Sequence, residues 1–132
     1  MLGDLIYEGQ GRITGSRILN AEENKIEYTL IEEGKFKDIP VHVIATFWTI
    51  PAGKNTVHSE SQAIITTKDS VETATYKAYG IGRYSESGGT SFRGTVFYKT
   101  TIVKLSFLNN MIYVFEAESD KNNHSAKIWE WN

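Results

Sequence analysis

The stretch that most constrains the fold is residues 57–101, where three segments of strand length follow one another with turn signals between them. Polar and apolar residues alternate over residues 57–67, and this period of two is typical of a strand with one buried face. Residues 68–71 and 85–89 are rich in the Asp, Ser and Gly residues that tight turns need. The stretch therefore predicts a β-meander.

The same alternation continues on both sides of the meander. Further strands are expected at residues 5–15, 25–33, 36–50, 111–119 and 126–131. Residues 103–110 are compatible with a single helical turn or with a strand continuation. About eight strands with short connections predict an all-β fold, an antiparallel up-and-down barrel that forms one domain over residues 1–132. A chain of 132 residues has room for one hydrophobic core.

Composition argues against several classes of function. Fourteen basic and 16 acidic residues give a net charge of -2 without a basic cluster, so nucleic acid is not an expected partner. The absence of cysteine excludes disulfides, thiolate metal ligands and a cysteine nucleophile. The most apolar stretch, residues 39–50, is too short to span a bilayer, so no membrane partner is expected. Asp4 and Glu8 lie where a signal peptide needs basic and apolar residues, which favours a cytoplasmic location.

The hairpin at residues 68–71 predicts which face of the sheet points inward. If Asp69 and Ser70 form a two-residue loop, Lys68 pairs with Val71, and one face of both strands is free of charge. The other face carries charged residues, which are costly to bury unpaired, so the uncharged face is expected inside. The inward residues would be Ser59, Ser61, Ala63, Ile65, Ala74, Tyr76, Ala78, Gly80 and Gly82.

The strand at residues 90–101 has two possible orientations. Without a bulge, the same register points Arg93, Thr95 and Phe97 into the barrel. It leaves Phe92, Val96 and Tyr98 on the outer face. A lumenal Arg93 would need a carboxylate such as Glu32, or a ligand, and the outer aromatic residues would form a subunit contact. A one-residue bulge in the hairpin would reverse the assignment.

Several polar patterns could carry chemistry. His58, Glu60 and Gln62 share one strand face, but such alternation is ordinary on a solvated sheet, so no metal site is predicted. The Gly-x-Gly pairs at residues 9–11 and 80–82 are not followed by a helix, so no nucleotide cofactor, or any other, is expected. A glutamate in an apolar cavity could act as a general base, and the candidates are Glu8, Glu32 and Glu60.

The succession Tyr7-Glu8-x-Gln10, the glycine-punctuated strand at residues 80–83 and the segment at residues 92–94 resemble small prokaryotic proteins with the allene-oxide-cyclase-like barrel, a calycin-like architecture. In the plant cyclases the first strand carries a lumenal glutamate and, two positions on, an amide. The resemblance implies that Glu8 and Gln10 are the matching positions. It also implies a barrel that encloses an apolar or amphipathic small molecule and forms oligomers through outer strand faces.

Three functions are compatible with this sequence. The first is a barrel that binds a small apolar or amphipathic molecule in its lumen. The second is a cofactor-free cyclase or isomerase in which Glu8 with Gln10 steers a reactive apolar intermediate. The third is a structural homo-oligomer whose filled barrel binds no ligand. For the first, the expected ligand-binding residues are Tyr7, Tyr28, Phe47, Tyr76, Arg93, Phe97 and Phe115.

Overall fold

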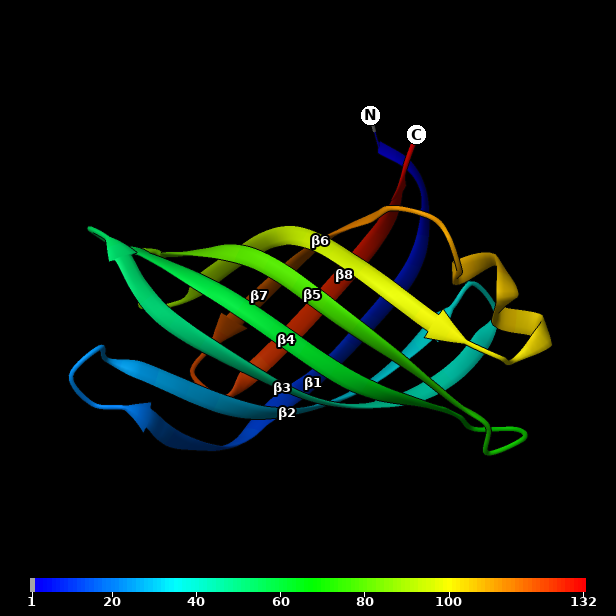
Figure 1. The fold of residues 1–132 in the computed structure, drawn as a ribbon, viewed down its shortest axis with the longest axis horizontal. Helices are drawn as coiled ribbons and strands as arrows, with labels where there is room; N and C mark the ends of the chain where they lie inside the picture. Colours follow the sequence, from blue (N-terminus) through cyan, green and yellow to red (C-terminus); the bar gives the residue numbers. More distant parts are fainter. Residues whose placement is uncertain (1) are drawn as a thin grey trace.

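The computed structural model describes residues 2–132 as a closed barrel of eight strands with one short helix (Figure 1). Each strand is hydrogen-bonded to the next in sequence, and the last pairs with the first. The predicted antiparallel up-and-down barrel is therefore confirmed. The elements are β1 (Leu2–Asn20), β2 (Lys25–Phe36), β3 (Ile39–Gly53), β4 (Thr56–Thr67), β5 (Thr73–Tyr84), β6 (Thr90–Thr100), the 3₁₀-helix η1 (Val103–Leu108), β7 (Tyr113–Asp120) and β8 (Asn123–Trp131).

The barrel closes where the two ends of the chain meet. β1 is longer than predicted, and it pairs with β8 from Leu2 to Arg12 and with β2 from Tyr7 to Asn20. Leu2 is opposite Trp131 in this register, so the termini lie side by side (Figure 1). Closure leaves neither β1 nor β8 with an unpaired edge along the region that they share.

The predicted pairing of β4 with β5 is confirmed. Ser61 lies opposite Ala78 and Ala63 lies opposite Tyr76, as a pairing of Lys68 with Val71 requires. β4 ends at Thr67 and β5 begins at Thr73, so the connection is longer than the predicted two-residue loop. The register of the two strands is nevertheless the predicted one. The small-residue face therefore points into the barrel.

The orientation of β6 follows the reversed assignment. Tyr84 pairs with Thr90, which leaves residues 85–89 in the loop, and β5 and β6 then pair without a register shift. An odd number of loop residues keeps even-numbered positions on the inner face of both strands. The inward placement of Arg93 and Phe97 is therefore wrong. Phe92, Val96 and Tyr98 are buried inside, so the subunit contact expected from them is wrong as well.

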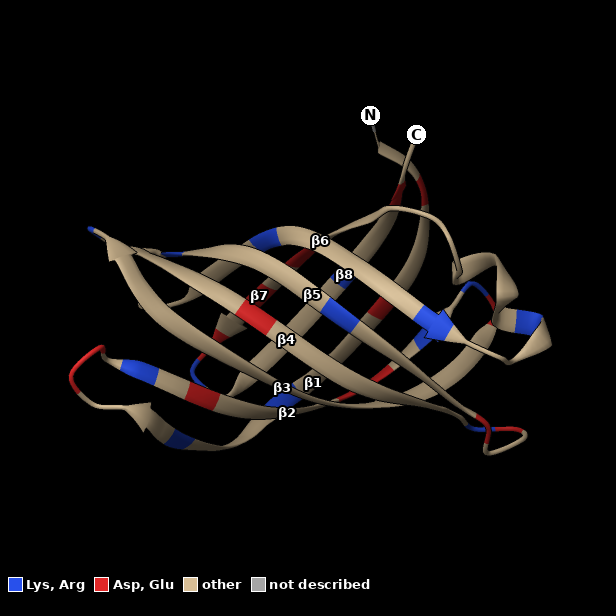
Figure 2. Ribbon diagram, viewed as in Figure 1, with Lys and Arg blue, Asp and Glu red and all other residues tan. Residues whose placement is uncertain are grey.

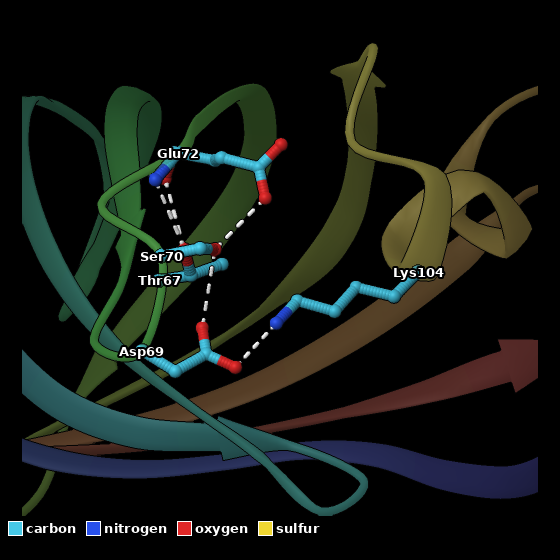
Figure 3. A network of polar contacts seen from close by, with 5 residues as sticks. All are labelled: Thr67, Asp69, Ser70, Glu72 and Lys104. Carbon is cyan, nitrogen blue, oxygen red and sulfur yellow. Dashed lines mark hydrogen bonds and ion pairs between the residues drawn. The ribbon is translucent and has the colours of Figure 1, made fainter.

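The helix η1 closes one end of the barrel. Its Leu105 and Leu108 side chains are fully buried, as is Ile102 just before it, so the helix acts as an apolar plug. Residues 103–110 are thus a short helix, one of the two predicted possibilities. On its outer side, Lys104 forms an ion pair with Asp69 in the β4–β5 turn (Figure 3).

The β4–β5 turn is itself held by hydrogen bonds between side chains and backbone (Figure 3). The backbone N–H of Glu72 donates to Oγ1 of Thr67 at 3.0 Å. The hydroxyl of Ser70 lies 2.9 Å from the same Thr67 oxygen and donates to a Glu72 carboxylate oxygen at 2.8 Å. The ion pair with Lys104 therefore joins the plug to an ordered turn.

Basic and acidic residues are scattered over the barrel, and neither sign gathers in one large cluster (Figure 2). On β6 and β7, Arg93 and Glu116 form an outer-face ion pair at 3.4 Å. On β1 and β2, Arg17 and Glu27 are 2.9 Å apart. Among residues 2–132, no helix is long and apolar enough to cross a bilayer.

Candidate lumenal site

A pair of glycines makes room for the ring of Tyr7 inside the barrel. Gly9 on β1 and Gly34 on β2 are register partners, and the Tyr7 phenol lies over both. A Cβ atom built at Gly9 would lie 2.2 Å from the Tyr7 hydroxyl oxygen, and one at Gly34 would lie 2.5 Å from it. Only glycine therefore allows the Tyr7 side chain to lie flat along these strands.

Glycines on β5 accept two further rings in the same way. A Cβ atom at Gly80 would lie 2.9 Å from the Phe115 ring, and one at Gly82 would lie 2.7 Å from the Phe92 ring. The space that glycines open on the inner face is thus filled by aromatic rings from the same strand or from nearby strands. These rings narrow the lumen that the small inward residues of β4 and β5 would otherwise leave open.

A cavity of about 60 Å³ remains in the middle of the lumen. Its wall is mainly apolar, with a carboxylate, an imidazole, two serines and three tyrosines among its members. It is bounded by Tyr7, Leu30, Glu32, Phe36, Val43, Phe47, Ser59, Ser61, Ile65, Tyr76, Ala78, Phe92, Val96, Tyr98, Phe115, Ala117, His124, Ala126 and Ile128.

Four polar residues form a continuous series of contacts that starts at the cavity wall and ends near the β7–β8 turn. The Tyr7 hydroxyl donates to Oε1 of Glu32 at 2.7 Å. The other carboxylate oxygen, Oε2, lies 3.3 Å from Nε2 of His124. The second ring nitrogen, Nδ1 of His124, lies 2.8 Å from Oγ of Ser119. Tyr7, Glu32 and His124 are all at least nine-tenths buried, whereas Ser119 is only partly buried.

The four residues of this series lie on four strands, β1, β2, β7 and β8. Glu32 shares the inner face of β2 with Leu30, and it lies opposite Gly11 and Val43 on the neighbouring strands. His124 and Ser119 are register partners at the turn between β7 and β8. Closure of β8 onto β1 brings His124 opposite Gly11, which places the imidazole near Glu32.

Glu32 is compensated rather than isolated. A buried carboxylate without partners is costly, and here each oxygen has a polar partner, one of them a group that can carry positive charge. Burial, and then the nearby Glu32 charge, raises the pKa of Tyr7 far above its usual range. Tyr7 therefore stays protonated and remains a donor to Glu32.

The Tyr98 hydroxyl differs from its neighbours. Among residues 2–132 it is the buried side-chain group without a hydrogen-bond partner, although Tyr98 is only 8% exposed and lines the cavity. Its ring is fixed by edge contacts with Phe36, Tyr76 and Tyr113. A buried polar group without a partner costs free energy, so this hydroxyl is a donor available to a molecule in the cavity.

Most of the predicted ligand-binding aromatics face the lumen. Tyr7, Phe47, Tyr76 and Phe115 line the cavity. Tyr28 is stacked on Phe47 at 5.1 Å between ring centroids, farther towards one end of the barrel and only half-buried.

Two predicted ligand-binding residues lie outside instead. The Arg93 side chain is 75% exposed and forms its ion pair with Glu116, so it does not meet Glu32. Phe97 is 48% exposed on the same outer face of β6.

The positions matched to the cyclases also lie outside. Glu8 and Gln10 are exposed on the outer face of β1, opposite Lys35 and Glu33. The lumenal placement that the resemblance implies for them is therefore wrong. Side chains alternate between the two faces of β1, and because Tyr7 and Gly9 face the lumen, Glu8 and Gln10 face outward. The lumenal glutamate is Glu32.

Sequence reasoning named Glu32 only as a possible base or partner of Arg93, and it missed Tyr98, His124 and Ser119 as site residues. The alternation of β2 carries one usable signal, because Glu32 falls in phase with the inward Leu30. In residues 2–132 no group of three or more His, Asp or Glu side chains is arranged to hold a metal.

Comparisons with known proteins show a shared fold. No family model and no curated protein matches the chain. A crystal structure of a protein of unknown function from Clostridium acetobutylicum superposes with a TM-score of 0.82 at 11% identity, covering 98% of both chains. A conserved protein of unknown function from Rhodopseudomonas palustris gives a TM-score of 0.79 at 13% identity, covering 98% of this chain and 97% of the other. The up-and-down topology fits a calycin-like class.

Proposed function

We propose that the barrel binds a small, uncharged, amphipathic molecule in its lumen. The observation that carries the proposal is the unpartnered hydroxyl of Tyr98 on the wall of a mainly apolar cavity. Apolar walls with a few placed polar groups are the usual composition of a small-molecule site. A ligand with one acceptor oxygen would pair with Tyr98 while its carbon atoms contact Leu30, Val43 and Val96.

The cavity volume limits the size of the ligand. At about 60 Å³ it is well below the roughly 300–1,000 Å³ typical of sites for drug-sized ligands. It is also smaller than an apolar cavity of about 150 Å³ that accepts benzene. A molecule of about three to five non-hydrogen atoms, such as a short ketone or alcohol, matches this space.

Charge limits the ligand as well. Both carboxylate oxygens of Glu32 already have polar partners, so a charged ligand would add an unpaired charge to an apolar interior. A neutral ligand avoids that cost. The proposal therefore favours acetone or isopropanol over acetate, which has a similar size.

Binding can be tested by titrating the protein with these three probes and following methyl resonances by NMR. We expect saturable shifts at Leu30, Val43, Ile65 and Val96 with acetone and isopropanol, and none with acetate. Tyr98→Phe should weaken binding by roughly two- to tenfold, the effect of one hydrogen bond. Tyr79→Phe, on the outer face, is the matched control. The absence of saturable lumenal shifts with any probe would refute the proposal, and native mass spectrometry of protein from its own source would reveal a retained ligand.

The cyclase alternative receives no support through Glu8 and Gln10, since both face away from the lumen. An enzymatic role for this barrel would have to use the lumenal carboxylate, Glu32.

A further inference from the structure

We infer that the lumen is a proton-transfer site, in which Glu32 removes a proton from the carbon next to the carbonyl of a small ketone or aldehyde. This inference rests on the proposed function and adds a reaction to it. Tyr98 would donate a hydrogen bond to the carbonyl oxygen. The structural basis is the presence of a free donor and a compensated carboxylate on the wall of one cavity.

The first step of the argument concerns Glu32. Its two oxygens offer about four lone-pair sites, and the contacts with Tyr7 and His124 use one on each oxygen. The carboxylate therefore keeps acceptor capacity, and Glu32 borders the cavity. A carboxylate that keeps a free lone pair beside a cavity can accept a proton from a molecule bound there. Tyr7 is a positioning residue, since it fixes Oε1 without having to contact the substrate.

The second step concerns the route of the proton. His124 stands between Glu32 and Ser119, with one ring nitrogen towards each. Ser119 is partly exposed beside the β7–β8 turn, whereas Glu32 is buried. When His124 is the neutral tautomer protonated at Nδ1, a proton taken up by Glu32 can pass to Nε2, and the Nδ1 proton then passes to Ser119. A purely structural partner for Glu32 would not need this second connection towards solvent.

The third step concerns the developing negative charge. When the C–H bond breaks, its electron pair forms the carbon–carbon double bond of an enolate, and the negative charge moves to the carbonyl oxygen. A donor aimed at that oxygen lowers the barrier, as oxyanion donors do in other enzymes. Burial holds the pKa of Tyr98 well above its usual value, so its hydroxyl keeps the proton that it must donate.

The reaction balances without a cofactor. Glu32 gains the proton and the substrate becomes an enolate held by Tyr98. Return of a proton to the same carbon exchanges its hydrogen with solvent, and in an unsaturated carbonyl compound return to the far carbon moves the double bond. The class of reaction is therefore carbonyl α-proton exchange or double-bond isomerisation.

The test is solvent exchange of acetone in D₂O, followed by loss of its proton NMR signal with wild-type protein. We expect exchange above the buffer rate, a loss of about 100-fold or more with Glu32→Gln, and a loss of about tenfold or more with Tyr98→Phe. Glu118→Gln, an exposed glutamate on β7, should exchange at the wild-type rate.

Tyr98→Phe keeps the test decisive if Glu32→Gln fails to fold, because it removes a hydroxyl that has no partner among the described residues. Saturable binding of acetone with exchange at the buffer rate would overturn the proton-transfer inference and leave the proposed function standing. Equal exchange by wild-type and Tyr98→Phe proteins would overturn the role of Tyr98. The absence of binding would overturn the proposed function itself.

Discussion

The hydroxyl of Tyr7 donates to Glu32 across two neighbouring strands although the two residues are not register partners. Tyr7 is opposite Phe36, and Glu32 is opposite Gly11. The 2.7 Å bond forms because the phenol lies diagonally over Gly9 and Gly34. The position of the lumenal carboxylate thus depends on two residues that have no side chain.

Gly34→Ala should therefore destabilise the barrel and displace Tyr7. Its methyl group would meet the Tyr7 oxygen at 2.5 Å and the backbone oxygen of Glu8 at 2.7 Å. Overpacking of this kind costs about 1–3 kcal/mol, measurable as a lower midpoint in urea unfolding. Gly15→Ala is the control, because a Cβ there meets nothing within 4 Å. Equal stability of the two variants would contradict the close packing of Tyr7 against Gly34.

Removing one member of the buried Glu32–His124 pair should cost more than removing both. His124→Leu leaves one carboxylate oxygen of the buried Glu32 without its polar partner, a loss of about 1–3 kcal/mol. The double variant Glu32→Leu/His124→Leu also removes that unsatisfied carboxylate, and we expect it to be more stable than His124→Leu alone. A double-mutant cycle of unfolding free energies measures the coupling. Additive effects would show that the two residues do not interact.

Alkaline pH should unfold the protein through its lumenal tyrosines. Burial raises the pKa of Tyr7, Tyr76 and Tyr98. Above about pH 10 the unfolded chain releases tyrosine protons that the folded chain still holds, so stability falls as pH rises. Below that pH both states keep these protons, so tyrosine ionisation does not change the free energy of unfolding. The ultraviolet absorbance of tyrosinate should show fewer than the seven tyrosines titrating before unfolding, whereas ordinary titration of all seven would contradict their burial.

The helix η1 should contribute to stability through its apolar side and not through its ion pair. Leu105→Ala opens a cavity at a fully buried position and should cost about 2–5 kcal/mol. Lys104→Ala removes the solvent-facing ion pair with Asp69 and should leave the thermal midpoint nearly unchanged. A larger effect of Lys104→Ala than of Leu105→Ala would reverse this assignment.

The barrel was predictable because alternation and turn residues are local signals. The inner face of β4 and β5 follows from the short Asp-Ser turn, and it is confirmed. The orientation of β6 was not predictable from the sequence. One residue more or less in the loop at 85–89 decides whether Arg93 or Phe92 points into the barrel. The pairing of Glu32 with His124 is harder still, because it depends on how the sheet closes across the barrel and not on either strand alone.

The strand that seals the cylinder also delivers His124. During synthesis from the N-terminus, β1 to β7 can pair in order. The second edge of β1 stays unpaired until β8, the last strand, has been made. Until then Glu32 has Tyr7 beside it but no imidazole. Completion of the wall and assembly of the acid–base pair are consequently one event, so an unfinished chain cannot carry a finished site.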